Sequence, residues 1–346
     1  MSISKLLKGI KGRTPIQNSI FLTGTTVCLL LSNMIVSDFQ GAASASTPPV
    51  KSNPLKYSDI KPHYGADEMV LIFDSSKGEV QFEVSGEVNL RVLWGEGASH
   101  CEDSIVGPQI VTCSVNEDVT VVRLTGVLES FGPDEEKIHE GVDNLLSVRN
   151  WGDVDLNNLE NAFWGARRLK EVPQTLPKNI FSLKNTFRRS GYVGEDILEW
   201  DISGVTDLSY IFAETLAFNT NLKDWDTSSV KNFEGVFKGA RSFNQPLPWD
   251  TSSGENFSRM FDGAVRFNQS LASWDVSKAT DMERMFAGSR NFNQDLSGWC
   301  VKQFVEKQQN HLVGVVEIGS TPSQFDAGAS EWMEGRPVWG ECPGKD

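Results

Sequence analysis

Aspartates recur at one position of a repeated segment, and their spacing could create a binding site for a cation. Each of them follows a tryptophan, and the four are Asp201, Asp226, Asp250 and Asp275. If the repeats stack about 5 Å apart, the carboxylates form a column. Neighbouring carboxylates suit Ca²⁺, so the column is a predicted calcium site. The alternative is that each aspartate, with the serine two residues later, bonds the backbone of its own turn.

Other chemistry has little support in the sequence. It contains no G-x-S-x-G, Walker, G-x-G-x-x-G or H-E-x-x-H motif. The histidines are scattered outside the repeats, at His63, His100, His139 and His311. A zinc site made of His100, Cys101 and Cys113 would lack a fourth ligand and the short C-x-x-C spacing. We therefore predict that the chain is not an enzyme and has no cofactor, with Ca²⁺ at the aspartate column as the one candidate.

The aspartates belong to six copies of one short unit, which together occupy residues 151–299. The clearest copy runs from Asp275 to Trp299, and tryptophans recur from Trp200 in steps of 25, 24, 25 and 25 residues. Each unit has a central phenylalanine: Phe163, Phe187, Phe212, Phe237, Phe261 and Phe286. Such a period predicts a solenoid, whose coils bury their apolar sides against one another. This fold offers an extended surface rather than a deep catalytic pocket.

Within one unit, the pattern predicts a short helix and a short strand. Five residues before each central phenylalanine stands Asn, Asp or Ser, the residue types that cap helix N-termini. Apolar residues then follow at the i, i+3, i+4 spacing of one helical face. Glycines two residues after the phenylalanine would end the helix in four units: Gly165, Gly239, Gly263 and Gly288. The L-x-x-W stretch is expected to form the strand.

Asparagines also align across four successive units, directly after a second phenylalanine. They are Asn219, Asn244, Asn268 and Asn293. Side-chain amides at such positions can bond the backbone of the neighbouring coil, so we expect an asparagine ladder.

A small β-sandwich is predicted before the repeats, over residues 67–130. Five short strands are expected there, at 69–73, 79–84, 89–94, 109–115 and 119–124. The segment Trp94–Gly97 resembles the W-G-D-G turn of PKD-like modules, with Glu96 in place of the aspartate. Residues 46–66 have the composition of a linker, and residues 131–150 are interpreted as an acidic connector. The predicted fold class is thus an α/β repeat, a leucine-rich-repeat-like solenoid with a short strand and helix per coil, preceded by a β-sandwich.

The first 45 residues have the pattern of a secretory signal peptide. A basic start is followed by an apolar run at about residues 20–36 and by the small residues Ala43-Ser44-Ala45. An uncleaved anchor helix is the alternative. We expect a secreted or cell-surface protein that is not inserted in a membrane after the signal is removed.

Cysteine pairing agrees with export. After signal removal Cys101, Cys113, Cys300 and Cys342 are left, and an even count in an exported chain predicts two disulfides. Three pairings are open, and proximity in sequence favours Cys101–Cys113 and Cys300–Cys342. Residues 300–346 do not repeat and are interpreted as a cap held by the second disulfide.

The repeat resembles that of BspA-like surface proteins, known for a Mycoplasma lipoprotein-type repeat of 25 residues. The residues that carry the resemblance are Trp274–Ser277, Met285-Phe286 and Phe292–Leu296, and the similarity is best over residues 200–299. The resemblance implies an exported, leucine-rich-repeat-like protein with a role in adhesion. It supplies no catalytic residues.

The net charge and the residues that vary between units limit the classes of binding partner. The net charge of −14 disfavours nucleic acid and anionic membranes, which are themselves polyanionic. Residues between the Leu and Trp positions vary from unit to unit, and we predict that they bind an extracellular protein or glycan: Lys223, Asp224, Pro248, Ala272, Ser273 and Ser297. The alternatives are a structural envelope or matrix protein that self-associates, or, more remotely, a hydrolase. The oligomeric state does not follow from the sequence.

Overall fold

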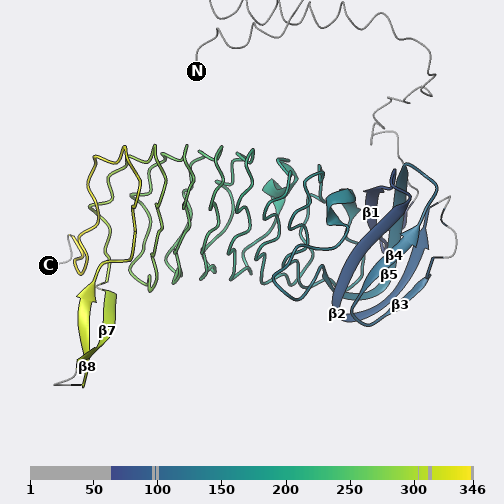
Figure 1. Cartoon of the computed structure of the whole chain (residues 1–346), viewed down its shortest axis with the longest axis horizontal. Coiled ribbons are helices and arrows are strands. Elements are labelled where there is room, and N and C mark those ends of the chain that lie inside the picture. The colour runs from purple at the N-terminus through teal and green to yellow at the C-terminus, as the bar shows by residue number, and fades with distance from the viewer. Residues whose placement is uncertain (1–63, 96–97, 99–100, 303, 311–313, 344–346) are drawn as a thin grey trace, which may run out of the picture. The chain divides into compact units, whose positions relative to one another are not determined.

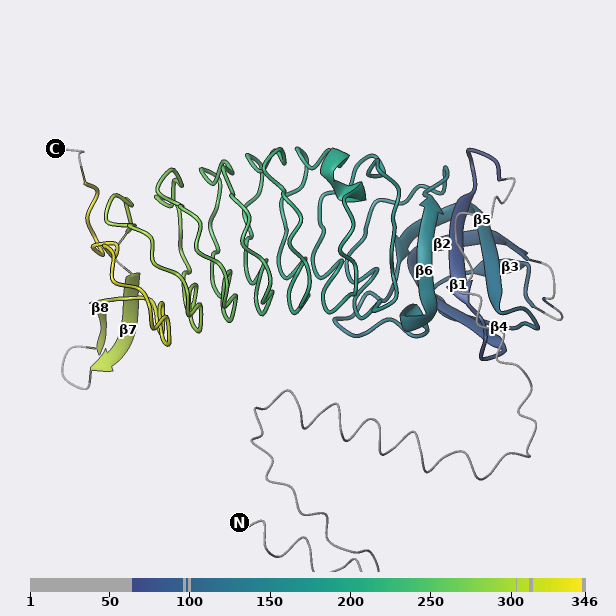
Figure 2. The same ribbon diagram turned by 90° about the horizontal axis from the view of Figure 1, so that it is seen from above.

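The computed structural model describes residues 64–343, apart from 96–97, 99–100, 303 and 311–313. The predicted signal peptide and nearly all of the predicted linker lie outside this range. Two elements are visible in Figures 1 and 2: an antiparallel sheet, and a series of coils that lie side by side between this sheet and a C-terminal hairpin. All of the described residues belong to one compact unit.

The N-terminal sheet has six strands, all paired antiparallel, in the order β3-β2-β5-β1-β6 with β4 also on β2. They are β1 (Met69–Asp74), β2 (Glu79–Trp94), β3 (Ser104–Val106), β4 (Gln109–Ser114), β5 (Val119–Phe131) and β6 (Leu145–Asn150). The predicted sandwich is therefore wrong, because these strands form a single sheet.

One long, bent strand, β2, accounts for this difference. The segments 79–84 and 89–94, predicted as separate strands, are two halves of β2. Between them, the register with β5 shifts from Ser85 to Val88, and Gly86 has a φ of 72°. Such an irregularity bends a strand without ending it, so one half of β2 pairs with β4 and the other with β3. The residues between the two halves, which we predicted to form a turn, form a bulge within one strand.

The predicted helix in each coil is also wrong. The described residues contain only two helices, the short 3₁₀ turns η4 (Val142–Asn144) and η5 (Asp196–Glu199). No helix in this part of the chain is long and apolar enough to cross a membrane. In each coil, the residue two positions before the central phenylalanine has a φ between 55° and 61°, namely Asn161, Asn185, Tyr210, Gly235, Arg259 and Arg284. A residue in this left-handed region interrupts a right-handed helix.

Consecutive turns take the place of the helix, and their backbone donors alternate between two kinds of partner. Met260 donates to the carbonyl of Phe257 within its own turn, at 3.3 Å. Phe261 and Gly263 instead donate to the carbonyls of Met285 and Ala287 on the next coil, at 2.8 and 2.7 Å. The coils are thus joined by parallel pairing, which also links Ser182, Asp207, Asn232, Asn256 and Asp281 in one column. The apolar spacing that indicated a helix reflects this stacking.

The core of the coils consists of aligned aromatic side chains. Central phenylalanines of neighbouring coils have ring centroids 5.5–6.0 Å apart. A second column contains Phe218, Phe243, Phe267 and Phe292 at 6.0–6.1 Å. The indole N–H groups form hydrogen bonds between coils. For example, Trp274 Nε1 donates to the Leu247 carbonyl of the preceding coil at 2.9 Å. The L-x-x-W stretch forms turns rather than the predicted strand, for example with Trp274 N donating to Leu271 O at 3.1 Å.

The predicted asparagine ladder is present. The backbone N–H groups of Asn244, Asn268 and Asn293 donate to Oδ1 of the asparagine on the preceding coil, at 2.8, 2.9 and 2.9 Å. The ladder continues to Met333, whose N–H donates to Asn293 Oδ1 at 2.6 Å.

Part of the C-terminal segment continues the coil pattern as a seventh turn. Gln324 and Gly328 have positive φ values of 52° and 80°, and the carbonyls of Phe325 and Ala327 accept hydrogen bonds from the sixth coil. The hairpin of β7 (Phe304–Asn310) and β8 (Gly314–Ser320) precedes this turn. Disulfides join Cys300 to Cys342 and Cys101 to Cys113, as predicted.

Replacing Gly263 by alanine is expected to lower the free energy of unfolding by about 1 kcal/mol, because Gly263 has a φ of 75°. A Cβ there would lie 3.7 Å from Gly239 Cα, an ordinary contact, so the cost comes from the backbone. Urea denaturation measures it. Gly298→Ala is the control, since Gly298 lacks a positive φ and a Cβ there would meet no atom within 4 Å. Equal losses in the two variants would contradict this explanation.

Candidate binding surface

The side chains predicted to bind a partner form one edge of the coils. Lys223, Asp224, Pro248, Ala272, Ser273 and Ser297 are all exposed. They lie between buried columns, because Leu222, Leu271, Trp225 and Trp274 point into the core. Binding by these residues stays a prediction. Much of the edge is acidic, since it also carries the exposed aspartates of the predicted column.

Each aspartate of that column bonds its own turn. Asp201 Oδ1 accepts hydrogen bonds from the N–H and hydroxyl of Ser203, at 3.1 and 2.7 Å, and Asp226 accepts the same pair from Ser228 at 3.0 and 2.7 Å. These bonds lower the pKa of the Asp201 and Asp226 carboxyl groups. The N–H groups of the serines after Asp250 and Asp275 donate to those carboxylates at 2.9 Å.

This geometry matches the turn alternative. Within the described ranges, no group of three or more His, Cys, Asp or Glu side chains could hold a metal ion. Calcium binding by neighbouring aspartates stays a prediction that a titration can test.

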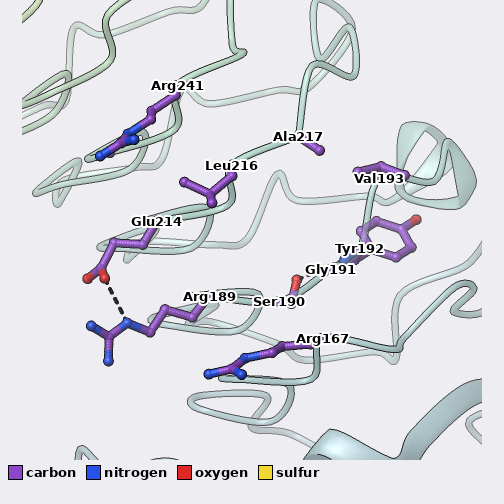
Figure 3. Close-up of a pocket in the computed structure, with 11 residues that line it drawn as sticks. Arg167, Arg189, Ser190, Gly191, Tyr192, Val193, Glu214, Leu216, Ala217 and Arg241 are labelled. Atoms are coloured by element: carbon purple, nitrogen blue, oxygen red, sulfur yellow. Dashed lines mark hydrogen bonds and ion pairs between the residues drawn. The ribbon is translucent and has the colours of Figure 1, made fainter. Parts of the chain in front are cut away.

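A different surface has concave shape and concentrated charge. A hollow of about 660 Å³ extends over several coils and is lined by Arg167, Arg189, Tyr192, Glu214, Leu216 and Arg241, among others. In Figure 3 the side chains of Arg167, Arg189 and Arg241 extend to the same side of the stacked turns. Leu216 is 60% exposed and lies between them, so the first hollow combines positive charge with an apolar side chain.

A second hollow of about 610 Å³ adjoins the first and shares Arg241 with it. It adds Arg266 and Arg290, together with Gly263, Val265, Gly288 and Asn291. We call the two hollows together the arginine groove; its basic residues are Arg167, Arg189, Arg241, Arg266 and Arg290. All five are exposed.

The turn geometry places these arginines in line. Arg241 and Arg290 stand four residues after a central phenylalanine, and Arg266 stands five residues after one. They follow the second left-handed residue of their coil, which is Gly239, Gly288 or Gly263. These glycines stack closely, since a Cβ on Gly263 or Gly288 would lie 3.7 or 3.6 Å from the glycine Cα of the preceding coil. The floor of the groove therefore has no side chains at these positions, while the arginines flank it.

One carboxylate belongs to the described lining of the groove, that of Glu214. It accepts a hydrogen bond from Arg189 Nε at 2.7 Å and lies 3.3 Å from Arg188 Nη2. Partial burial raises the pKa of the Glu214 carboxyl, but its bonds and proximity to the two arginines lower it further, and the net shift is downward. Glu214 is thus ionised and neutralises Arg189.

The other four arginines have no such partner. Side chains of Arg167, Arg241, Arg266 and Arg290 form no ion pair or hydrogen bond with any residue that the structure describes. The groove is therefore a strip of uncompensated positive charge on an acidic protein. It can attract an anion by charge and bond it through the planar guanidinium groups.

We did not predict this site from the sequence. Its signal was present, because an arginine follows the Gly-Ala, Gly-Ala-Val or Gly-Ser segment of units four, five and six. Arg266 is shifted by one residue relative to Arg241 and Arg290, so an alignment of the units does not place the three arginines in one column. The negative net charge of the chain also argued against an anionic partner.

Comparison with protein families locates the repeat region among known sequences. Residues 157–248, 181–299 and 247–315 match the family described as "Mycoplasma protein of unknown function, DUF285". The repeats are thus similar to those of this family. The matched segments cover the coils and the start of the C-terminal hairpin, a little under half of the chain. This result agrees with the Mycoplasma-type repeat indicated by the sequence.

The DUF285 match leaves the N-terminal sheet outside its range and names no ligand. Neither the curated proteins nor the solved structures included a match to the chain. The arginine groove lies within the matched region, so any function of the groove has to be argued from its own chemistry.

Proposed function

We propose that the chain is an exported repeat protein that binds an extracellular macromolecule through the surface of its coils. The arginine groove is the observation that carries this proposal, because it is concave, runs across successive coils and holds four arginines whose side chains have no ion-pair or hydrogen-bond partner among the described residues. A binding role fits better than catalysis, since the groove contains no nucleophile paired with a general base.

Export rests on two independent supports. The first is the predicted signal peptide over residues 1–45. The second is the pair of disulfides, because such bonds persist mainly in oxidising compartments. The resemblances to BspA-like leucine-rich-repeat surface proteins and, for the turn at Trp94, to PKD-like modules agree with a secreted or cell-surface location.

The test is binding of the exported protein to an array of glycans and extracellular matrix proteins, with Ca²⁺ and with a chelator. We expect saturable binding to a subset of the array. Loss of binding in chelator would assign a cation to the aspartate column, whereas unchanged binding would support the turn geometry described above. An absence of binding under both conditions would overturn the proposal.

A structural protein that self-associates is the second candidate. Met333 and Val338 in the segment after the sixth coil are 85% and 47% exposed, which leaves apolar surface there. Light scattering over a range of protein concentrations distinguishes the two roles, because only self-association makes the apparent mass rise with concentration.

A further inference from the structure

We infer that the arginine groove binds an anionic polysaccharide, with successive carboxylate or sulfate groups of the polymer meeting arginines on successive coils. This inference rests on the proposed function and specifies its ligand class. It starts from a difference between two sets of arginines in the coils: one set forms ion pairs with carboxylates, and the other forms none among the described residues.

Arginines on the turns themselves are paired with carboxylates. Arg259 contacts Glu234 and Glu283 at 3.2 and 3.4 Å, and Arg284 contacts Asp262 at 3.1 Å. Arg241, Arg266 and Arg290 of the groove lie in coils four to six but are unpaired among the described residues, although the chain has 46 acidic and only 32 basic residues. Lining up like charges is unfavourable unless a counter-charge is present. The missing counter-charge therefore points to a ligand with several negative charges.

The spacing of the coils selects the kind of polymer. Arg241, Arg266 and Arg290 belong to three successive coils, which are joined by backbone hydrogen bonds and so lie about 5 Å apart. One sugar unit of an extended polysaccharide advances by a comparable length. In an extended peptide, side chains on one face recur about every 6.6 Å, so an acidic peptide matches the coil spacing less closely than a chain of sugar units does.

The composition of the groove suits sugars as well as charge. Guanidinium groups form bidentate hydrogen bonds with carboxylate and sulfate oxygens. The glycines at the bottom of the groove have no side chains, so a sugar ring can approach the backbone there. Leu216 and Val193, which are 60% and 51% exposed, can pack against the apolar face of a sugar at one end of the groove. The acidic edge around Asp226 and Asp250 would repel the same polymer, which confines it to the groove.

The test uses the full exported chain and heparin as the probe, in titration calorimetry at low and high salt. The triple variant Arg241→Glu, Arg266→Glu and Arg290→Glu is expected to bind heparin at least about tenfold more weakly than the parent chain. These side chains are exposed and unpaired among the described residues, so the variant should keep its melting temperature, which circular dichroism checks. Binding of the parent chain should weaken as salt increases.

A matched control variant changes the net charge equally but elsewhere. The control carries Lys77→Glu, Lys231→Glu and Lys278→Glu, at exposed positions that do not line the groove. This variant should retain heparin affinity within about twofold. If instead the control loses affinity and the groove variant keeps it, the groove is not the site and the inference fails.

Two further probes separate this inference from the proposed function. Polyglutamate that competes as well as heparin would point to an acidic protein partner and overturn the polysaccharide assignment. Binding of neutral glycans or matrix proteins on the array without heparin binding would leave the proposed function intact and refute the inference. Failure of all probes would refute both.

Discussion

Replacing Phe237 by alanine is expected to lower the free energy of unfolding by about 3–5 kcal/mol, as for other large aromatic side chains removed from a core. Phe237 is fully buried, and its ring lies 6.0 Å from Phe212, 5.8 Å from Phe261 and 3.8 Å from Phe243, between centroids. Alanine would leave a cavity between rigid coils, which cannot collapse without breaking the backbone bonds that join them. Urea denaturation followed by tryptophan fluorescence measures the loss.

The position of Phe237 in the fourth coil adds a second expectation. Neighbouring coils are joined by backbone hydrogen bonds, so weakening a central coil can uncouple the coils on either side of it. The variant should therefore unfold over a broader denaturant range, with a smaller m-value. Leu216→Ala is the control, since Leu216 is 60% exposed and its loss should cost less than about 0.5 kcal/mol. Similar losses in both variants would contradict the aromatic core described here.

Lowering the pH from about 6.5 to about 4 is expected to remove about 3 kcal/mol of stability through His139 alone. This histidine is fully buried, and burial together with the charge of Lys137 lowers its pKa to about 4, although a backbone hydrogen bond at Glu83 acts in the opposite direction. The folded protein thus keeps His139 neutral in this range, while the unfolded chain protonates it near pH 6.5. Unfolding takes up a proton, so stability falls as the pH falls and levels off below the folded pKa.

The surroundings of His139 explain its neutrality. The Glu83 N–H donates to Nε2 at 2.6 Å, Nδ1 has no partner among the described residues, and the ring lies edge-on to Phe131 with centroids 5.0 Å apart. The charged groups nearby are the Glu83 carboxylate and Lys137, which form an ion pair at 3.0 Å. A protonated Nε2 could not accept the Glu83 N–H bond.

Comparison with His139→Gln isolates this contribution from the carboxylates that also titrate in acid. Glutamine can still accept the Glu83 N–H bond but does not titrate. Melting temperatures at a series of pH values should therefore run parallel above pH 7 and diverge between pH 6.5 and 4, with the parent chain falling more steeply. Parallel curves throughout would show that His139 is not kept neutral by the fold.

The period of the units, the columns of buried aromatic residues, the asparagine ladder and both disulfides could be predicted from the sequence. Each follows from identical residues at fixed spacing, because stacked coils place equivalent positions next to one another. The same spacing misled us about local structure. Apolar residues at i, i+3 and i+4 of a unit such as Phe257, Met260 and Phe261 are compatible with a helix and equally with a series of tight turns.

Only the tertiary structure decided between these two. Alternate backbone N–H groups bond the next coil instead of their own turn, and this is possible when residues such as Tyr210 and Arg259 adopt a positive φ. The residue types at these positions do not predict a positive φ. The energetic cost of this conformation is offset by hydrogen bonds to the next coil, about 25 residues away in sequence. The arginine groove has the same origin: Arg241, Arg266 and Arg290 are far apart in sequence, and their charges become one surface only because the coils stack. The sequence by itself determined that the units repeat and what they bury, whereas backbone pairing between coils determined their shape and which charges meet.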